Sequence, residues 1–379
     1  MKKICLIGGE GIGIEVVESA SKVLQELAIP NVEIIEAHAG EVAEQKFGKA
    51  FPEDTRDAID SSDAILFGAT HQKARPVLGY LRFVLGNYAN IRPCKLYKGI
   101  NCPLKGVDDI DFVIIRENME SVYSVLRIGE GNIKTLVRKE VILNKKVHES
   151  VFNGSDGKFA LKIITEDESR RIADLACKKT VERKQAGYPG KLTIVHKANV
   201  LQKTDGLFRD ISYSIAQDYI NSHNIQVDDY FVDDMARRLV LLAQEQDVLL
   251  TINEYGDILS DLGAELVGGL GIAPSACIGS DHPYFEPVHG SAPDIAGQGI
   301  ANPLAALLSL QMLLEYLNIK EAKTLEHAIE EYFLLVGAPG DNWKIIPRDL
   351  VPKIYQEQDK FAKTEMITQK IISLLNNHN

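Results

Sequence analysis

The segment Gly256-Asp257-Ile258-Leu259-Ser260-Asp261 carries two carboxylates at positions i and i+4. On a helix this spacing places both side chains on one face, where two hard oxygen ligands can share a divalent cation. Further along the chain, Glu286-Pro287-Val288-His289-Gly290-Ser291-Ala292-Pro293-Asp294 combines glycine and proline with a hydrogen-bonding histidine and a final acid. Such a loop can bring backbone and polar groups close to a nucleotide. Together the two segments predict a cation site beside a nucleotide-binding loop.

Short apolar runs alternate with amphipathic stretches on either side of these segments. The runs typical of buried strands are residues 4–7, 32–37, 64–67, 112–115, 192–195 and 248–252. Apolar residues recur with helical spacing over 16–27 and 208–219, and the apolar stretch 303–317 is expected to be a buried helix. This alternation predicts an α/β protein with a mainly parallel central sheet.

Length and composition narrow the class of protein. A chain of 379 residues is long enough for about two domains. Its formal net charge is −11 and it has no long basic run, so nucleic acid is not an expected partner. The five cysteines are scattered without a Cys-x-x-Cys pair, which is typical of reduced thiols in a cytoplasmic protein. We expect no membrane span and no signal peptide.

The N-terminal run Gly8-Gly9-Glu10-Gly11-Ile12-Gly13 follows an expected strand and opens an expected helix. Gly9, Gly11 and Gly13 recur every second residue, which is not the G-x-G-x-x-G spacing of the dinucleotide fingerprint. A standard Rossmann fold is therefore not expected. The alternative is a tight turn between the strand and the helix.

Several residues at or near the ends of expected elements suit a carboxylate substrate. Guanidinium groups bind carboxylates bidentately, so Arg82, Arg92 and Arg116 would bind a di- or tricarboxylate if they meet in space. A single arginine is more often solvated or salt-bridged. Lys197, after the run 192–195, is a candidate base, and Tyr123 is a candidate proton donor; the alternative for each residue alone is a structural role.

A third carboxylate is available for the cation site. Asp233 and Asp234 follow a strand-like segment, and one of them could join Asp257 and Asp261. The alternative is an exposed acidic turn. Hard oxygen ligands favour Mg²⁺ or Mn²⁺ over zinc.

The stretch 127–164 breaks the alternation of strands and helices. It mixes β-branched and charged residues and contains the turn cluster Asn153-Gly154-Ser155-Asp156-Gly157. This composition predicts a hairpin-like arm. The arm would bury its apolar side only against something else, such as a second subunit; the alternative is a mobile surface insertion.

These segments, in this order from residue 4 to about 317, resemble the β-decarboxylating dehydrogenases, the family of isopropylmalate, isocitrate and homoisocitrate dehydrogenases. The motifs that carry the resemblance are the aspartate pair at 257 and 261, the loop 286–297 and Ile300-Ala301-Asn302-Pro303. The resemblance implies a two-domain α/β fold, distinct from the Rossmann fold. Residues 1–92 and 266–379 would form a larger cofactor-side domain, and 93–265 a smaller dimerisation domain.

The resemblance also implies roles for individual residues. The acid–base pair would be Tyr123 and Lys197. The substrate would be bound by Arg82, Arg92, Arg116 and Asn199, and Mg²⁺ or Mn²⁺ by Asp233, Asp257 and Asp261. NAD would be bound by His289, Gly290, Ser291, Ala292, Pro293, Asp294 and Asn302. Lys197 and Asp233 would reach across from the neighbouring subunit of a homodimer with shared active sites. Asp294 favours NAD because an acid can accept hydrogen bonds from ribose hydroxyls and repels a 2′-phosphate.

The implied reaction is NAD- and metal-dependent oxidative decarboxylation of a 3-substituted malate, a 2-hydroxy acid. The segment 68–82 would select the substrate. Lys73 or Arg75 would meet the third carboxylate of homoisocitrate or isocitrate, whereas Val77 and Leu78 favour 3-isopropylmalate. A tartrate- or malate-type substrate is a further alternative.

The chain departs from the family pattern at several positions. Glu10 and Ile14 stand where Asp and Pro are usual, and Met119 and Ser121 where Thr and Gly are usual. Residues 338–346 lack the usual Thr/Asp/Gly-rich pattern. A non-catalytic regulatory subunit would be expected to lose part of the Tyr/Lys/Asp set, which this chain retains. A plain nucleotide-binding protein would need neither the arginines nor the metal site.

Overall fold

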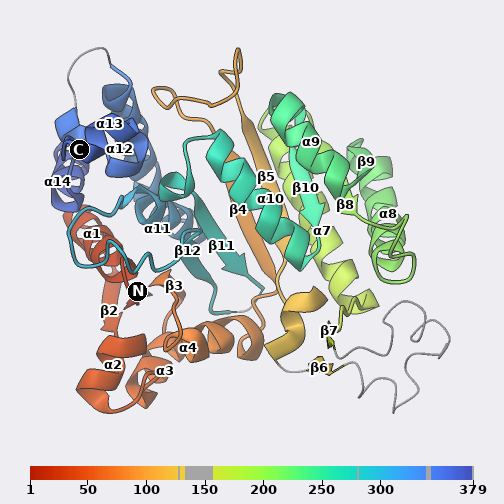
Figure 1. The fold of residues 1–379 in the computed structure, drawn as a ribbon, viewed down its shortest axis with the longest axis horizontal. Coiled ribbons are helices and arrows are strands. Elements are labelled where there is room, and N and C mark those ends of the chain that lie inside the picture. Colours follow the sequence, from red (N-terminus) through yellow and green to blue (C-terminus); the bar gives the residue numbers. More distant parts are fainter. Residues whose placement is uncertain (127–128, 133–156, 280, 339–342, 378–379) are drawn as a thin grey trace.

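A ten-stranded sheet crosses the protein in the order β2-β1-β3-β12-β11-β4-β5-β10-β8-β9 (Figure 1). The computed structural model describes residues 1–126, 129–132, 157–279, 281–338 and 343–377. The strands of the sheet are β1 (Lys2–Gly9), β2 (Val32–Ala37), β3 (Ala64–Ala69), β4 (Ala89–Lys95), β5 (Asp111–Glu117), β8 (Lys191–His196), β9 (Gln226–Phe231), β10 (Val248–Thr251), β11 (Pro274–Ile278) and β12 (Tyr284–Pro287). Antiparallel pairing is confined to β12-β11-β4-β5, and the other neighbours are parallel. The predicted α/β fold with a mainly parallel sheet is confirmed.

All six expected strand runs lie in this sheet. The strands β4, β11 and β12 were not predicted, and β9 was indicated only at its end, by the strand-like segment before Asp233. Polar residues and prolines interrupt these strands, so they lack the apolar runs that mark the others. Pro93 is tolerated in β4 because β11 pairs only with residues 89–91, so the missing N–H of Pro93 costs no bond to β11.

Helices cover both faces of the sheet. One face carries α1 (Gly13–Glu26), α7 (Glu166–Gln185), α8 (Thr204–His223), α11 (Leu304–Tyr316), α12 (Glu321–Val336) and α14 (Thr364–Leu375). The other face carries α9 (Val232–Leu242) and α10 (Asn253–Leu266) over one half. Shorter helices are α2 (Gly40–Phe47), α3 (Glu53–Asp60), α4 (Arg75–Gly79) and α13 (Lys353–Glu357). No helix in the described ranges is long and apolar enough to cross a bilayer.

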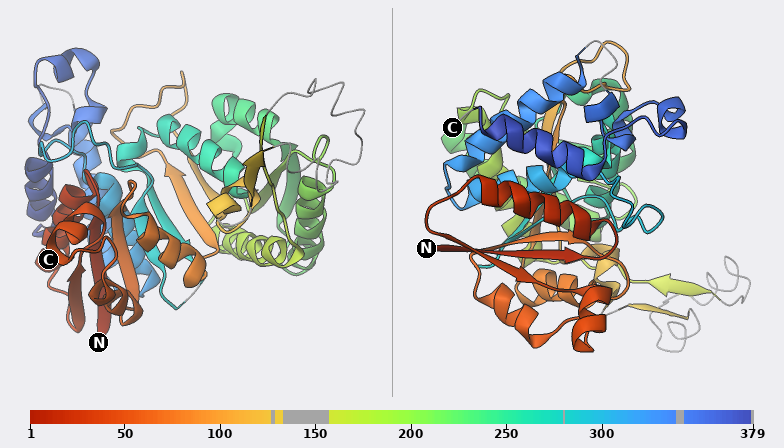
Figure 2. Two further views of the ribbon diagram at one scale, coloured as in Figure 1. Left: turned by 60° about the horizontal axis from the view of Figure 1, so that its bottom comes forward. Right: turned by 90° about the vertical axis from the view of Figure 1, so that its left-hand side faces the viewer.

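The predicted arm begins as a hairpin. β6 (Glu130–Asn132) and β7 (Lys158–Ala160) pair antiparallel. The right-hand view of Figure 2 shows this pair standing out from the rest of the fold. The expected turn residues 153–156 lie outside the described residues.

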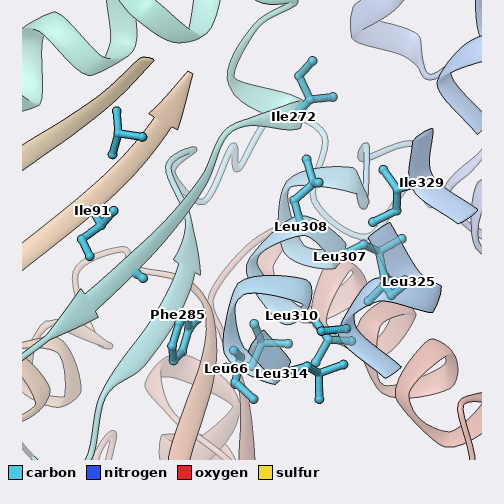
Figure 3. Packing of buried hydrophobic residues seen from close by; sticks show 14 of the residues in the cluster. Leu66, Ile91, Ile272, Phe285, Leu307, Leu308, Leu310, Leu314, Leu325 and Ile329 are labelled. Atoms are coloured by element: carbon cyan, nitrogen blue, oxygen red, sulfur yellow. The ribbon is translucent and has the colours of Figure 1, made fainter. Parts of the chain in front are cut away.

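The largest core cluster joins strands near both ends of the chain. Leu66 of β3 and Phe285 of β12 lie against α11, whose leucines at 307, 308, 310 and 314 are buried (Figure 3). Successive residues of β1 point to opposite faces, so Ile4 joins this cluster while Cys5 joins another. Burial on both faces explains why β3 and the inner residues of β1 are apolar. The expected buried helix at 303–317 is α11.

The chain folds back so that its two ends build the same half of the sheet. β1 to β4 with β11 and β12 form one half, and the residues between 111 and 251 form the strands of the other. The sheet is continuous across the predicted domain boundary, and residue 92 lies within β4. The division into 1–92 with 266–379 and 93–265 stays a prediction.

Candidate active site

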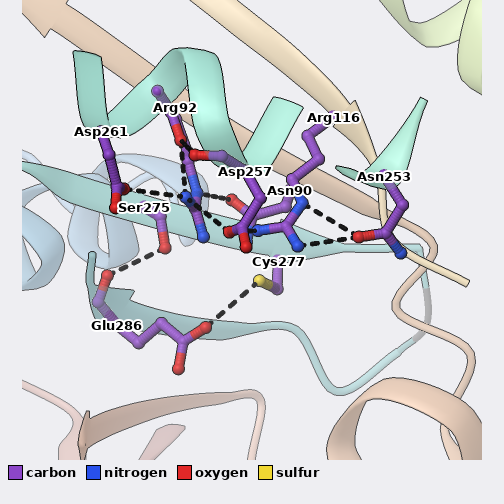
Figure 4. Close-up of polar contacts among 10 residues, drawn as sticks. Asn90, Arg92, Arg116, Asn253, Asp257, Asp261, Ser275, Cys277 and Glu286 are labelled. Carbon is purple, nitrogen blue, oxygen red and sulfur yellow. Dashed lines mark hydrogen bonds and ion pairs between the residues drawn. The ribbon is translucent and has the colours of Figure 1, made fainter. Parts of the chain in front are cut away.

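Two buried arginines reach the same carboxylate at the centre of the sheet (Figure 4). Arg92 Nη1, from β4, lies 3.3 Å from Asp257 Oδ1 and 3.8 Å from Asp261 Oδ1. Arg116 Nη1, from the neighbouring strand β5, donates to the same oxygen of Asp257. The two arginine side chains are 8% and 3% exposed, whereas Asp257 is 38% exposed. The arginines therefore form a floor and the carboxylates face the solvent.

Helix α10 presents its polar groups with a four-residue period. Asn253, Asp257 and Asp261 lie on one face of the helix, as the spacing predicts. Asn253 Oδ1 accepts hydrogen bonds from Arg116 Nε at 3.2 Å and Nη2 at 2.7 Å. Sequence reasoning missed Asn253, although it stands one helical repeat before Asp257. It also missed Ser260, whose Oγ lies 2.6 Å from Arg92 Nη1.

Glycine at position 256 lets Arg116 pass beneath α10. A Cβ atom on Gly256 would lie 2.6 Å from Arg116 Cγ and 2.3 Å from Thr251 Oγ1. Contacts that short do not occur without displacement of one partner. The helix and β5 can therefore approach only because this position has no side chain.

Arg82 joins Arg92 and Arg116 around Glu286 of β12. Burial raises the pKa of Glu286 above its ordinary value, while the charges of all three arginines act to lower it. Arg82 lies on a single π-helical turn, η1 (Tyr80–Val84). Its Nε is buried and has no hydrogen-bond partner in the described part of the chain. The structure thus brings the three arginines together and leaves the buried Nε donor of Arg82 without a partner among the described residues.

The charges at this floor favour a bound anion. Burial, followed by repulsion from Arg92, lowers the pKa of Arg116 to about 9. The attraction of Asp257 opposes this shift without reversing it. Negative charge added beside these guanidinium groups would reduce their mutual repulsion, so a substrate carboxylate suits this position.

Tyr123 lies at the edge of the same cluster. It belongs to the 3₁₀ helix η2 (Ser121–Leu126), and its ring centre is 5.9 Å from Arg116 Cζ. Burial, and then the charge of Asp257, raise the pKa of Tyr123 above its ordinary value. The phenol therefore keeps its proton at neutral pH and can donate it.

The first residue of this helical turn explains one departure from the family pattern. Ser121 has φ of +69°, in the left-handed region where glycine is the usual residue. Its N–H donates to Ile163 O at 2.9 Å, which connects η2 to the segment between β7 and α7. The backbone conformation that favours glycine is thus retained with serine in place.

Lys197, Asn199 and Asp233 lie apart from this cluster. Lys197 follows β8 and forms an ion pair with Asp233, which lies in the first turn of α9 rather than in an irregular acidic turn. Asn199 is exposed in the turn after Lys197. Strand β10 lies between β8 and β5, so the axes of β8 and β5 are two strand spacings, or about 10 Å, apart. Within the described ranges, no three metal-ligating side chains form a cluster. One chain therefore brings together Asp257 and Asp261 without Asp233.

The expected nucleotide loop borders a small cavity of about 130 Å³. The residues that line it are Ile12, Gly271, His289, Ile295, Ile300, Ala301, Asn302, Arg348 and Asp349. His289 Nε2 is buried without a hydrogen-bond partner among the described residues, and burial lowers the pKa of this histidine. A neutral imidazole with a free nitrogen fits a nucleobase. Asp294 lies exposed on the adjoining loop.

Arg348 and Asp349 were not predicted at this cavity. Asp349 Oδ2 accepts a hydrogen bond from Asn302 Nδ2 at 3.1 Å. The two residues follow the segment 338–346, of which 339–342 lie outside the described residues. Only the fold brings this C-terminal segment to the loop, so no local pattern marks it.

The glycine-rich turn after β1 supports the loops on either side of it. Ile12 N–H donates to Ser291 O at 2.9 Å, and Glu10 N–H donates to Ala69 O at 2.9 Å. A Cβ atom on Gly11 would lie 2.0 Å from Ser291 O. These N–H groups bind protein carbonyls instead of being free for a phosphate. The tight-turn interpretation therefore describes this segment.

Glu10 explains a second departure from the family pattern. This residue is 7% exposed, and its Oε2 accepts hydrogen bonds from the N–H groups of His71 at 2.7 Å and Ala74 at 3.0 Å. Glu10 thereby fixes the start of the segment that would select the substrate. Within that segment, Lys73 forms an ion pair with Glu44, whereas Arg75 is exposed.

Comparison with known proteins identifies the family. The family model described as "Isocitrate/isopropylmalate dehydrogenase" matches residues 3–371. The chain is 44% identical to the 3-isopropylmalate/3-methylmalate dehydrogenase of Methanocaldococcus jannaschii, over 88% of this chain and 92% of that protein. It is 42% identical to the isocitrate/homoisocitrate dehydrogenase of Thermus thermophilus, over 86% and 90%. The crystal structure of isocitrate dehydrogenase from Methylococcus capsulatus superposes with a TM-score of 0.81 at 34% identity, covering 99% of both chains. This chain therefore belongs to the isocitrate/isopropylmalate dehydrogenase family and is an oxidative decarboxylating dehydrogenase.

Proposed function

We propose that the protein catalyses the NAD- and divalent-metal-dependent oxidative decarboxylation of a 3-substituted malate. The observation that carries this proposal is the meeting of buried Arg92 and Arg116 at Asp257, with Tyr123 beside them. A carboxylate-binding floor, a pair of hard oxygen ligands and a protonated phenol are the groups that such a reaction requires.

The side chains divide the chemistry between them. Arg82, Arg92 and Arg116 bind the substrate carboxylates. Lys197 accepts the proton of the 2-hydroxyl group, and Tyr123 donates a proton to the substrate carbon that loses CO₂. When bound, NAD would accept the hydride, and the divalent cation would supply Lewis-acid polarisation.

The side chains of this protein fit both the divalent cation and NAD. Asp257 and Asp261 provide hard oxygens that suit Mg²⁺ or Mn²⁺. His289 and Asn302, with the loop residues Gly290, Ser291, Ala292, Pro293 and Asp294, would hold the NAD. The partnerless Nε2 of His289 supports this assignment.

A homodimer would supply Lys197, Asn199 and Asp233 to the neighbouring site. Exposed apolar side chains support such an interface. Val240 and Leu241 on α9 are 46% and 56% exposed, Ile258 on α10 is 63% exposed, and Val200 near Lys197 is 66% exposed. Large exposed apolar residues gathered near a site are typical of a protein–protein interface. We also propose the two-domain division given above and, with the five cysteines all free, a cytoplasmic location.

The substrate is proposed to be homoisocitrate or isocitrate, with 3-isopropylmalate as the second candidate. Lys73 is engaged by Glu44, so recognition of a third carboxylate would rest on Arg75. Half-buried Leu78 and buried Val77 favour an apolar substituent. The relatives act, by their names, on 3-isopropylmalate, 3-methylmalate, isocitrate and homoisocitrate.

A substrate panel with Mn²⁺ and NAD or NADP tests the function. It comprises isocitrate, homoisocitrate, 3-isopropylmalate, tartrate and malate. Arg75→Ala is expected to lower kcat/KM for the tricarboxylates by about tenfold or more, because it removes a charge-assisted hydrogen bond. Lys73→Ala is the control, since Lys73 already binds Glu44. Turnover of 3-isopropylmalate alone would contradict the tricarboxylate proposal, and cofactor binding without turnover of any substrate would support a regulatory subunit.

Asp294 is expected to set the preference for NAD. Asp294→Ala should shift the ratio of kcat/KM for NAD to that for NADP toward NADP by about tenfold, because removing the carboxylate removes its repulsion of a 2′-phosphate. Steady-state kinetics with both cofactors measure the ratio. Asp218→Ala, an exposed acid on α8, should leave it unchanged. A wild-type preference for NADP would refute the role of Asp294.

A further inference from the structure

The turn that carries Lys197 is fixed by hydrogen bonds on both sides of that residue. The N–H of Lys197 donates to Asp205 Oδ2 at 2.8 Å, and Asp205 is fully buried. The carbonyl of Lys197 accepts from the N–H groups of Val200 at 3.0 Å and Leu201 at 2.9 Å. The main chain at the proposed base therefore has little freedom.

The next peptide N–H, that of Ala198, is bound by the side chain of His196. Ala198 N–H donates to Nδ1 of His196 at 3.0 Å. His196 is the last residue of β8 and is 0% exposed. One ring thus bridges the residues on either side of Lys197.

The hydrogen-bond network defines the protonation of that ring. Since Nδ1 accepts from Ala198, the ring proton must be on Nε2. Nε2 donates to Asp229 Oδ2 at 2.8 Å, and the hydroxyl of Tyr213 donates to Asp229 Oδ1 at 2.6 Å. Asp229 on β9 and Tyr213 on α8 thereby hold the imidazole in the tautomer that leaves Nδ1 as an acceptor.

We propose that His196 is a positioning residue whose Nδ1 acceptor orients the Lys197–Asn199 turn for proton transfer. This inference rests on the proposed role of Lys197 as the base. On this proposal, residue 196 must offer a hydrogen-bond acceptor at its δ position. The contact of Nε2 with Asp229 keeps Nδ1 unprotonated, so that it can accept. His196 touches neither substrate nor cofactor in this assignment; it acts through the turn.

Two substitutions test the two hydrogen bonds of the His196 ring one at a time. His196→Asn keeps an acceptor at the δ position for Ala198 N–H but cannot reach Asp229. His196→Gln places an amide donor at the ε position for Asp229 but removes the δ acceptor. Each variant loses one buried hydrogen bond, so their melting temperatures should fall by similar amounts.

The expected result is a difference in kcat between the two variants. H196N should keep kcat within about threefold of wild type, whereas H196Q should lose about 10- to 100-fold, because displacing a catalytic group by about 1 Å costs up to that factor. KM for the 2-hydroxy acid should change less than kcat. Equal kcat values for the two variants, whether retained or lost, would overturn the proposal.

Hydrogen exchange at the Ala198 amide provides a second measurement that needs no turnover. Exchange should be faster in H196Q than in wild type and remain slow in H196N. Equal protection in both variants would show that Nδ1 does not hold the turn. Failure of the proposed function would instead show as an inactive wild type with a protected Ala198 amide, so the two failures are distinguishable.

Discussion

Replacing Lys197 with alanine is expected to lower kcat by about 10³-fold, within the range of about 10²–10⁴ that a positioned general base contributes. The Lys197 side chain is 26% exposed and pairs with Asp233, which is 67% exposed, so the melting temperature should change little. Steady-state kinetics with the best substrate of the panel measure the loss. A variant that keeps more than a tenth of wild-type kcat would exclude Lys197 as the base.

Mixed dimers test whether Lys197 serves the neighbouring subunit. A Lys197→Ala chain and an Asp257→Ala chain are each expected to have very low activity alone. If sites are shared, a mixed dimer holds one site with both residues intact, and co-refolding should restore a substantial fraction of wild-type activity. Two Lys197→Ala preparations mixed in the same way are the control. Absence of recovery in dimers shown to have exchanged subunits would mean that Lys197 and Asp257 of one chain serve the same site, so that sites are not shared.

Arg116→Lys is expected to lower kcat/KM by about 10²- to 10³-fold. Lysine keeps the positive charge but lacks the forked guanidinium group, which binds Asp257 through Nη1 and Asn253 through Nη2. Truncating one partner of a buried charged pair costs about 2–5 kcal/mol. Each 1.4 kcal/mol corresponds to about tenfold. Titration of substrate analogues and steady-state kinetics measure the effect on KM and kcat.

Gly256→Ala provides a matched test of the same geometry. It leaves Arg116 in the chain, but the added Cβ would lie 2.6 Å from Arg116 Cγ, so the guanidinium must move. Activity should fall in the same direction as in Arg116→Lys. Gly206→Ala on α8 is the control, because a Cβ atom there meets nothing within 4 Å. Wild-type activity in both Arg116→Lys and Gly256→Ala would contradict the assignment of the arginine floor.

The sequence predicted the parts of the fold that depend on local apolar patterns. Most of the six expected strands are buried on both faces, so their apolar runs are nearly continuous, whereas β2 at the edge of the sheet includes Glu33 and Glu36. β4 and β9 carry functional or network residues, Arg92 in one and Asp229 in the other, and these polar side chains obscure the strand signal. Short β11 begins at a proline and shows no alternation at all.

The candidate site was predictable where spacing along one element decides it. Asp257 and Asp261 share a face of α10 because their spacing is helical, and Asn253 could have been found by extending that spacing backward. Arg348 reaches the cavity beside His289 only through the path of the chain after α12, which no periodicity reveals. The role of His196 likewise depends on a tautomer that only its three-dimensional partners define.

The contacts of Glu10 have a consequence for protein engineering. Its carboxylate binds the start of the segment proposed to select the substrate, and the same turn binds Ser291 in the loop proposed for the cofactor. A segment 70–82 transplanted from a relative with aspartate at this position would arrive without the longer side chain that anchors it here. If this segment selects the substrate, its conformation depends on two distant stretches of sequence, and a graft that exchanges only one of them would lack a matching anchor.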